Sequence, residues 1–185
     1  MTVLASRGQL RASFLRWALL IVPAVSLAGF LSGRLAGSGA ENPWFAGLDK
    51  PAIFPPPAAF GIVWSILYVV MGIALTMVVT ARGARGRRPA IAMFLVQLAL
   101  NLAWTPLFFA AHRISAALWL LVALDVAVIV TIALFWRVRR EAALLLLPYL
   151  AWILFATWLN WEFLRANPDA DGAGARSNAA ARIEL

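Results

Sequence analysis

Five long apolar segments constrain this chain more than any other feature of its sequence. A helix of about 20 residues crosses the ~30 Å hydrocarbon core of a bilayer, and each segment is long enough to do so. We predict membrane-spanning helices over about residues 14–35, 60–81, 90–110, 114–136 and 142–164. The chain is 63% hydrophobic and 13% charged, whereas soluble domains are ~45–50% apolar and about 25% charged. The predicted fold class is therefore an all-α membrane protein: a five-helix transmembrane bundle with a long structured loop between helices 1 and 2.

The charged and reactive residues exclude several classes of function. The net charge of +8 comes from arginines between the apolar segments, which form no basic face with interleaved aromatic residues, so we predict no nucleic-acid partner. The absence of cysteine excludes disulfides, thiolate catalysis and iron–sulfur clusters. The single histidine, His112, falls at the short third-to-fourth connection, so we predict neither a metal site nor a haem ligand there.

The basic residues are divided unequally between the two sides of the membrane. The side opposite the N-terminus has Arg34, Lys50, Arg113 and Arg165 near the membrane. The N-terminal side collects Arg7, Arg11, Arg16, Arg82, Arg85, Arg87, Arg88, Arg137, Arg139 and Arg140. Because basic residues favour the cytoplasmic side, we predict a multi-pass protein of a bacterial cell membrane with its N-terminus in the cytoplasm. In an outer membrane, which is the alternative, the rule does not apply in this form.

The segments outside the spans differ in character. Residues 1–13 are predicted to be a polar arm, residues 14–165 the transmembrane domain, and residues 166–185 a disordered tail without a core-forming pattern. The connector over residues 36–59 contains Trp44, Phe45 and three consecutive prolines. Long connections of this kind are often functional lids, so we predict a folded cap, the alternative being an exposed linker.

Three helical stripes carry aromatic and amide side chains at helical spacing. They are Trp64, Tyr68 and Leu75; Gln97, Asn101, Trp104 and Phe108; and Tyr149, Trp152, Ala156 and Asn160. Amides are costly toward lipid, so these faces point inward. We predict that the stripes converge beneath the cap in one pocket for a large, flat, mainly apolar molecule, which indole and phenol rings would stack on and amides would orient. The alternative is that these residues only hold the bundle together.

Two further features leave alternatives open. The Gly29-x-x-x-Gly33 motif marks a surface for close helix approach, either within the bundle or between subunits. Asp125 lies near the middle of the fourth span, where a charged carboxylate costs at least ~2.5–3.5 kcal/mol. It is either functional or a neutral, hydrogen-bonded residue in a helix interface.

The order and spacing of five motifs resemble the translocator protein family, also called the TspO family or tryptophan-rich sensory proteins. The resemblance covers about residues 14–165. Its motifs are Trp44-Phe45 with Leu48-x-Lys50-Pro51; Pro55-Pro56; Trp64-x-x-Leu67-Tyr68-x-x-Met71-Gly72; Gln97-Leu-Ala-Leu-Asn101-x-x-Trp104-x-Pro106-x-Phe108-Phe109; and Leu147-Pro148-Tyr149-Leu-Ala-Trp152-x-x-Phe155-Ala156-x-x-Leu159-Asn160.

The resemblance implies a homodimeric five-helix bundle that binds porphyrins and haem-related tetrapyrroles, sterols and benzodiazepine-type drugs. Carried over by motif, the pocket would include Trp64, Tyr68, Asn101, Trp104, Trp152, Ala156 and Leu159. With the other stripe residues and Trp44 of the cap, the candidate ligand-binding set is Trp44, Trp64, Tyr68, Gln97, Asn101, Trp104, Phe108, Tyr149, Trp152, Ala156, Leu159 and Asn160. The cholesterol motif of animal members is incomplete, with Trp161 at its tyrosine position, so sterol binding is not expected.

These observations favour a membrane receptor or carrier for tetrapyrroles, with a role in their transport, sensing or stress-related disposal. No required cofactor and no catalytic residue is predicted, and porphyrin or haem is the candidate ligand. Membrane lipid and a second copy of the chain are the other expected partners. Two alternatives stay open: light- and oxygen-dependent porphyrin breakdown, and a scaffold whose interaction with another protein depends on ligand.

Overall fold

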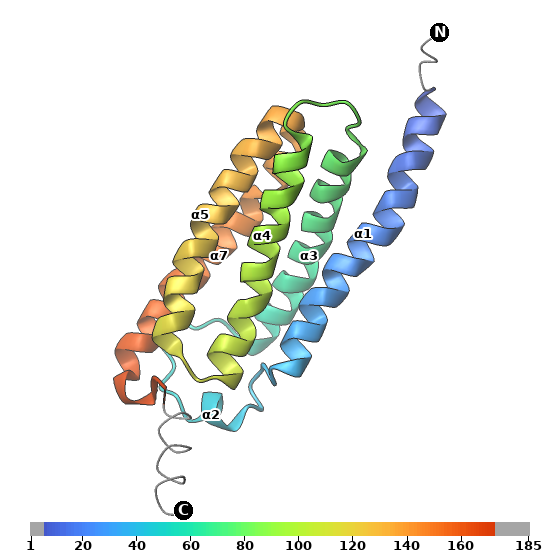
Figure 1. Cartoon of the computed structure of the whole chain (residues 1–185). Helices are drawn as coiled ribbons and strands as arrows, with labels where there is room; N and C mark the ends of the chain where they lie inside the picture. Colours follow the sequence, from blue (N-terminus) through green and yellow to red (C-terminus); the bar gives the residue numbers. More distant parts are fainter. Residues whose placement is uncertain (1–5, 173–185) are drawn as a thin grey trace, which may run out of the picture.

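The computed structural model describes residues 6–172, which form a helical bundle (Figure 1). Within them, five helical segments are long and apolar enough to cross a membrane, which confirms the predicted fold class. The elements in chain order are α1 (Arg7–Leu35), α2 (Pro43–Ala46), α3 (Pro57–Thr80), α4 (Arg87–Thr105), η1 (Pro106–Ala110), α5 (Ile114–Val138), α6 (Arg140–Leu145), α7 (Leu147–Ala166) and η2 (Pro168–Ala170). Helices α6 and α7 together make the fifth crossing.

Helix α1 lies at the edge of the bundle and packs mainly against α3 (Figure 1). Glycines permit this contact. A Cβ atom added at Gly29 would lie 2.1 Å from the ring of Tyr68, and one added at Gly72 would lie 2.8 Å from Cα of Val22. Neither distance leaves room for a side chain, so the close approach of α1 and α3 depends on glycine in both helices. At Gly29, the Gly29-x-x-x-Gly33 motif therefore packs within the chain.

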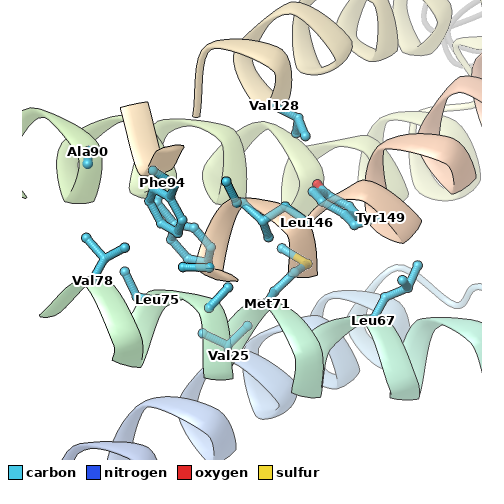
Figure 2. Close-up of a cluster of buried hydrophobic side chains, with 14 of the residues drawn as sticks. Val25, Leu67, Met71, Leu75, Val78, Ala90, Phe94, Val128, Leu146 and Tyr149 are labelled. Atoms are coloured by element: carbon cyan, nitrogen blue, oxygen red, sulfur yellow. The ribbon is translucent and has the colours of Figure 1, made fainter. Parts of the chain in front are cut away.

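Apolar side chains form two cores along the bundle. The larger core joins the spanning helices, and Figure 2 shows Met71 of α3, Phe94 of α4 and Tyr149 of α7 among its buried members. The smaller core lies at the cap end, where Phe45 and Phe108 pack with residues of α5 and α7. Because the cap contributes to this second core, it is held against the bundle by apolar burial.

The first helix begins earlier than expected. Ser6 and Gln9 form a reciprocal capping box, in which each side chain accepts a hydrogen bond from the backbone N–H of the other residue. This cap satisfies donors that would otherwise be unpaired at the start of α1. The predicted polar arm over 1–13 is therefore wrong for residues 7–13, which are helical, and residues 1–5 lie outside the described residues.

Prolines reshape two of the predicted spans. Pro106 ends α4 and begins the π-helical turn η1, in which the backbone N–H of Ala111 donates to the carbonyl of Pro106 at 2.9 Å. The predicted fifth span over 142–164 is not one continuous helix, because it is interrupted at Leu146. Pro148 has no N–H to donate to the carbonyl of Leu144, so the chain breaks there and starts α7 with proline in its first turn.

The cap is folded, as predicted. Asn42 begins the short helix α2, its side-chain oxygen accepting from the backbone N–H of Phe45 at 3.0 Å. The ammonium of Lys50 donates to the backbone carbonyls of Phe45 and Leu48, which closes the following turn. Desolvation lowers the pKa of Lys50, while the neighbouring Asp49 carboxylate opposes that change. Backbone groups in the cap are thus satisfied by local side chains.

The segment after α7 is ordered as far as Gly172 and is tied to the cap end. The Asn167 amide exchanges two hydrogen bonds with the backbone of Asp49, at 2.7 and 3.0 Å. The N–H of Gly172 donates to the carbonyl of His112 at 2.8 Å, and a carboxylate oxygen of Asp171 accepts from the N–H of Ser115 at 3.1 Å. The prediction of a disordered tail from residue 166 is therefore wrong for 166–172, because Ala166 ends α7 and the following residues are ordered, and residues 173–185 lie outside the described residues.

Candidate functional site

A cavity of about 680 Å³ lies between the spanning helices beneath the cap. This volume falls within the ~300–1,000 Å³ that is typical of small-molecule sites. Helices α1, α3, α4, α5 and α7 all contribute to its wall, and Phe45 and Phe54 cover it from the cap. Nine residues of the predicted set line it: Trp64, Tyr68, Asn101, Trp104, Phe108, Trp152, Ala156, Leu159 and Asn160. The three stripes therefore converge on one cavity.

Aromatic rings form much of this wall. Trp64 stacks on Tyr68 along α3, with ring centroids 5.3 Å apart and planes inclined by 27°. Trp104 stacks on Phe108 across the junction of α4 and η1 at 5.1 Å and 25°. These spacings are those of attractive aromatic pairs, so the rings brace one another beside the cavity. The arrangement presents extended flat apolar surface to whatever enters.

A hydrogen-bond chain links three helices beside the cavity. The Tyr68 hydroxyl donates to the side-chain oxygen of Asn101 at 2.9 Å, and the Asn101 amide nitrogen donates to the Tyr149 hydroxyl at 3.2 Å. Tyr149 in turn donates to the side-chain oxygen of Gln97 at 2.9 Å. This chain joins α3, α4 and α7 through buried polar groups, which are costly in a membrane unless they are paired.

A second bridge lies nearer the cap. The indole N–H of Trp104 donates to the side-chain oxygen of Asn160 at 3.1 Å, and the Asn160 amide nitrogen donates to the carbonyl of Ile114 at 3.0 Å. The side-chain oxygen and nitrogen of both Asn101 and Asn160 are thus engaged within the protein. The stripes therefore have both of the roles considered above. Their aromatic residues line a cavity, and their amides connect the helices that form its walls.

Three residues of the predicted set do not line the cavity: Trp44, Gln97 and Tyr149. Gln97 and Tyr149 are both almost wholly buried, at 1% and 0% exposed, in the larger part of the bundle away from the cap. The stripe from Gln97 to Phe108 rises about 16 Å along the helix axis, and the cavity borders it only from Asn101 onward. Trp44 instead stacks on His112 at 4.4 Å with an interplanar angle of 18°, and neither ring borders the cavity.

The stripes did not identify the contribution of α1. Ser26, Gly29, Phe30, Gly33 and Arg34 all line the cavity. The available signal was the Gly29-x-x-x-Gly33 motif, which predicted close helix approach without showing that the same face borders a hollow. Because glycine has no side chain, a glycine face both admits the neighbouring helix and leaves space beside it.

Two donors at the cavity wall stay unpaired among the described residues. The hydroxyl of Ser26 and the indole nitrogen of Trp152 are buried and make no hydrogen bond within the part of the chain that the structure describes. Unpaired buried donors are unfavourable, so a side-chain movement that brought either one to the cavity surface would let it donate to an acceptor on a bound molecule.

Asp125 lies in the interface between α5 and α7. Its carboxyl oxygen is 2.8 Å from the hydroxyl of Thr157, which is also 2.9 Å from the carbonyl of Ile153. Thr157 has one hydroxyl proton for these two acceptors, and the other carboxyl oxygen of Asp125 is buried without a hydrogen-bond partner among the described residues, so the site favours a neutral carboxyl group. This geometry favours the structural interpretation of Asp125 over a direct role in the cavity, which it does not line.

Comparison with known proteins agrees with this architecture. A family model described as the TspO/MBR family matches residues 19–165. The chain is 40% identical to a tryptophan-rich protein TspO of Archaeoglobus fulgidus over 144 residues, which cover 78% of this chain and 92% of that relative. It is 39% identical to the translocator protein of Homo sapiens over 147 residues, covering 78% and 86% of the two chains. It is 35% identical to a tryptophan-rich sensory protein of Cereibacter sphaeroides over 138 residues, covering 73% and 85%. This integral multi-pass membrane protein therefore belongs to the TspO/MBR family.

Proposed function

We propose that the protein binds porphyrins and related tetrapyrroles in the cavity and serves as a receptor or carrier in their transport, sensing or disposal. The observation that carries this proposal is a cavity of about 680 Å³ whose wall contains two stacked aromatic pairs, Trp64 with Tyr68 and Trp104 with Phe108. A flat, extended and mainly apolar ligand gains most from such a wall, because stacking adds to the burial of apolar surface. The names of the relatives, translocator protein and tryptophan-rich sensory protein, fit a role in transport or sensing.

The cap and the unpaired donors give this proposal a mechanism. Phe45 and Phe54 line the cavity from the cap, so movement of the cap would widen the route by which a ligand enters. Once the ring is inside, a side-chain movement at Ser26 or Trp152 would let its buried donor reach an acceptor on the edge of the ring. Asn101 and Asn160 connect the walls and hold them at fixed spacing, which preorganises the space and lowers the cost of binding.

A porphyrin titration of the purified protein, followed by absorbance, tests the proposal. Trp64→Ala and Trp152→Ala each remove a ring from the cavity wall, and we expect about tenfold weaker binding, given ~0.5–1.5 kcal/mol for an aromatic pair beyond lost burial. Trp119→Ala is the matched control, because this tryptophan is 71% exposed on the outer face of α5. Equal affinities in all four proteins would remove the cavity from the function.

We further propose that α1 begins on the cytoplasmic side and that the protein forms a homodimer. The loop between α3 and α4 and the end of α5 lie at the same end of the bundle as the start of α1, and the arginine-rich sequences are found there (Figure 1). Since the chain has no cysteine of its own, a single cysteine can be introduced at Ala84 in the loop between α3 and α4. If this loop is cytoplasmic, a membrane-impermeant maleimide added to intact cells will not label the cysteine. Crosslinking in lipid measures the oligomeric state.

A further inference from the structure

One charged side chain borders the cavity. Arg34 lies in the last turn of α1, and every other lining residue is uncharged. Its side chain is exposed and makes no ion pair or hydrogen bond within residues 6–172. Glu41, which follows the lining residue Ala40 in the cap, makes no ion pair with it either. An unengaged guanidinium therefore stands at the rim of a largely apolar hollow.

The helix dipole and the membrane interface explain why an arginine stands at the end of α1, but they do not explain why it borders the cavity. A cation in the last turn of a helix interacts favourably with the helix dipole, and an arginine near a membrane interface can extend toward water. Arg113 stands at the same end of the bundle and is also exposed, yet it does not line the cavity. What distinguishes Arg34 is that its side chain forms part of the cavity wall.

The neighbouring backbone leaves this rim open. Gly37 and Gly39 both have positive φ angles, of 61° and 140°, and they turn the chain so that Ser38, Gly39 and Ala40 line the cavity beside the end of α1. Ser38 is itself engaged, because its hydroxyl donates to the carbonyl of Gly33 at 3.0 Å. The guanidinium is thus the strongest free donor group at this rim.

We propose that the cavity selects flat apolar ligands that carry a carboxylate, and that Arg34 binds this carboxylate at the cavity mouth. This inference rests on the proposed function and adds to it the ionic class and the orientation of the ligand. A guanidinium can bind a carboxylate through two parallel N–H···O bonds. The apolar ring then lies inward against Trp64 and Trp152, while the acid group stays at the cap end. The cavity interior offers no second charge, so the inverse orientation leaves the carboxylate without a partner.

The test compares a dicarboxylic porphyrin, protoporphyrin IX, with its dimethyl ester, which keeps the ring and removes the charge. The measured quantity is the ratio of acid affinity to ester affinity for the full-length protein in detergent, read by absorbance titration. We expect Arg34→Gln to lower this ratio about three- to tenfold, the range between exposed ion pairs and charged hydrogen bonds. Arg34→Lys keeps the charge and is expected to retain part of the ratio. Arg113→Gln, the matched control, is expected to leave it unchanged.

The outcomes separate this inference from the proposed function. If both porphyrins bind and Arg34→Gln leaves the ratio at its wild-type value, the inference is overturned while the cavity function stands. A ratio that falls equally in Arg113→Gln also overturns it, because the effect then comes from the general charge of that end. If neither porphyrin binds the wild-type protein, the proposed function fails and the inference fails with it.

Discussion

Substituting Gly29 by alanine tests how tightly α1 and α3 are packed beside the cavity. The added Cβ atom would lie 2.1 Å from one carbon of the Tyr68 ring and 2.3 Å from another, so the ring must move by more than 1 Å to restore an ordinary contact. Movement of this size breaks the 2.9 Å hydrogen bond from Tyr68 to Asn101. Overpacking costs about 1–3 kcal/mol, and a hydrogen bond between membrane helices contributes about 0.6 kcal/mol.

Helix preference acts in the opposite direction, because alanine in a helix interior is favoured over glycine by about 0.5–1 kcal/mol. The net expectation for Gly29→Ala is a loss of about 1–2 kcal/mol in the free energy of unfolding. The sign is therefore informative: without the clash, the same substitution would stabilise the helix.

Unfolding in mixed micelles with increasing sodium dodecyl sulfate, followed by circular dichroism, measures this free energy. Gly61→Ala is the matched control in α3, since a Cβ there has no atom within 4 Å and should cost nothing. In a Tyr68→Ala background the ring is absent, and the penalty of Gly29→Ala should disappear. The packing argument is refuted if Gly29→Ala is as stable as the wild type, or if its cost is unchanged when Tyr68 is removed.

Two further substitutions probe the hydrogen bonds that join separate parts of the fold. Asn101→Leu leaves the hydroxyl of Tyr68 without its acceptor and removes the amide that donates to the hydroxyl of Tyr149, and we expect a loss of about 1–2 kcal/mol in the same unfolding assay; an unchanged midpoint would show that this chain does not brace the cavity. Asn167→Ala removes both bonds to the backbone of Asp49, so amide hydrogen exchange should become faster in the cap while the centres of the spanning helices keep their protection. Faster exchange throughout the bundle would contradict a local role.

Much of the fold followed from elementary constraints on a chain in lipid. Length and hydropathy alone located five crossings, because a backbone in hydrocarbon must satisfy its own hydrogen bonds within helices. The spacing of Trp64, Asn101 and Trp152 placed these side chains on inward faces, and all three line the cavity. The composition of the connector also indicated a folded cap, which its buried Phe45 confirms.

The errors arose where local interactions override a hydropathy pattern. The start of α1 depends on a capping box between Ser6 and Gln9, which extends the helix into polar sequence. The break before α7 depends on the missing N–H of Pro148, which no count of apolar residues registers. The ordered segment after α7 depends on Asn167 meeting Asp49, more than a hundred residues earlier in the chain.

The membrane class, the number of crossings, the inward faces and the family could all be predicted from the amino-acid sequence, because each follows from local composition or from the spacing of motifs. Which inward residues border the cavity and which fill the core depends on how the helices pack, and therefore became known from the folded chain. Helical periodicity shows which way a side chain points but not where along the helix the cavity lies. Gln97 and Tyr149, which are buried in the core, therefore could not be distinguished from Trp104 and Asn160, which line the cavity. The close approach of α1 likewise could not be assigned from one glycine motif, because it requires the partner surface at Tyr68 and Gly72. For the same reason Arg34, one arginine among many in the sequence, acquired its place beside the cavity only when the chain was folded.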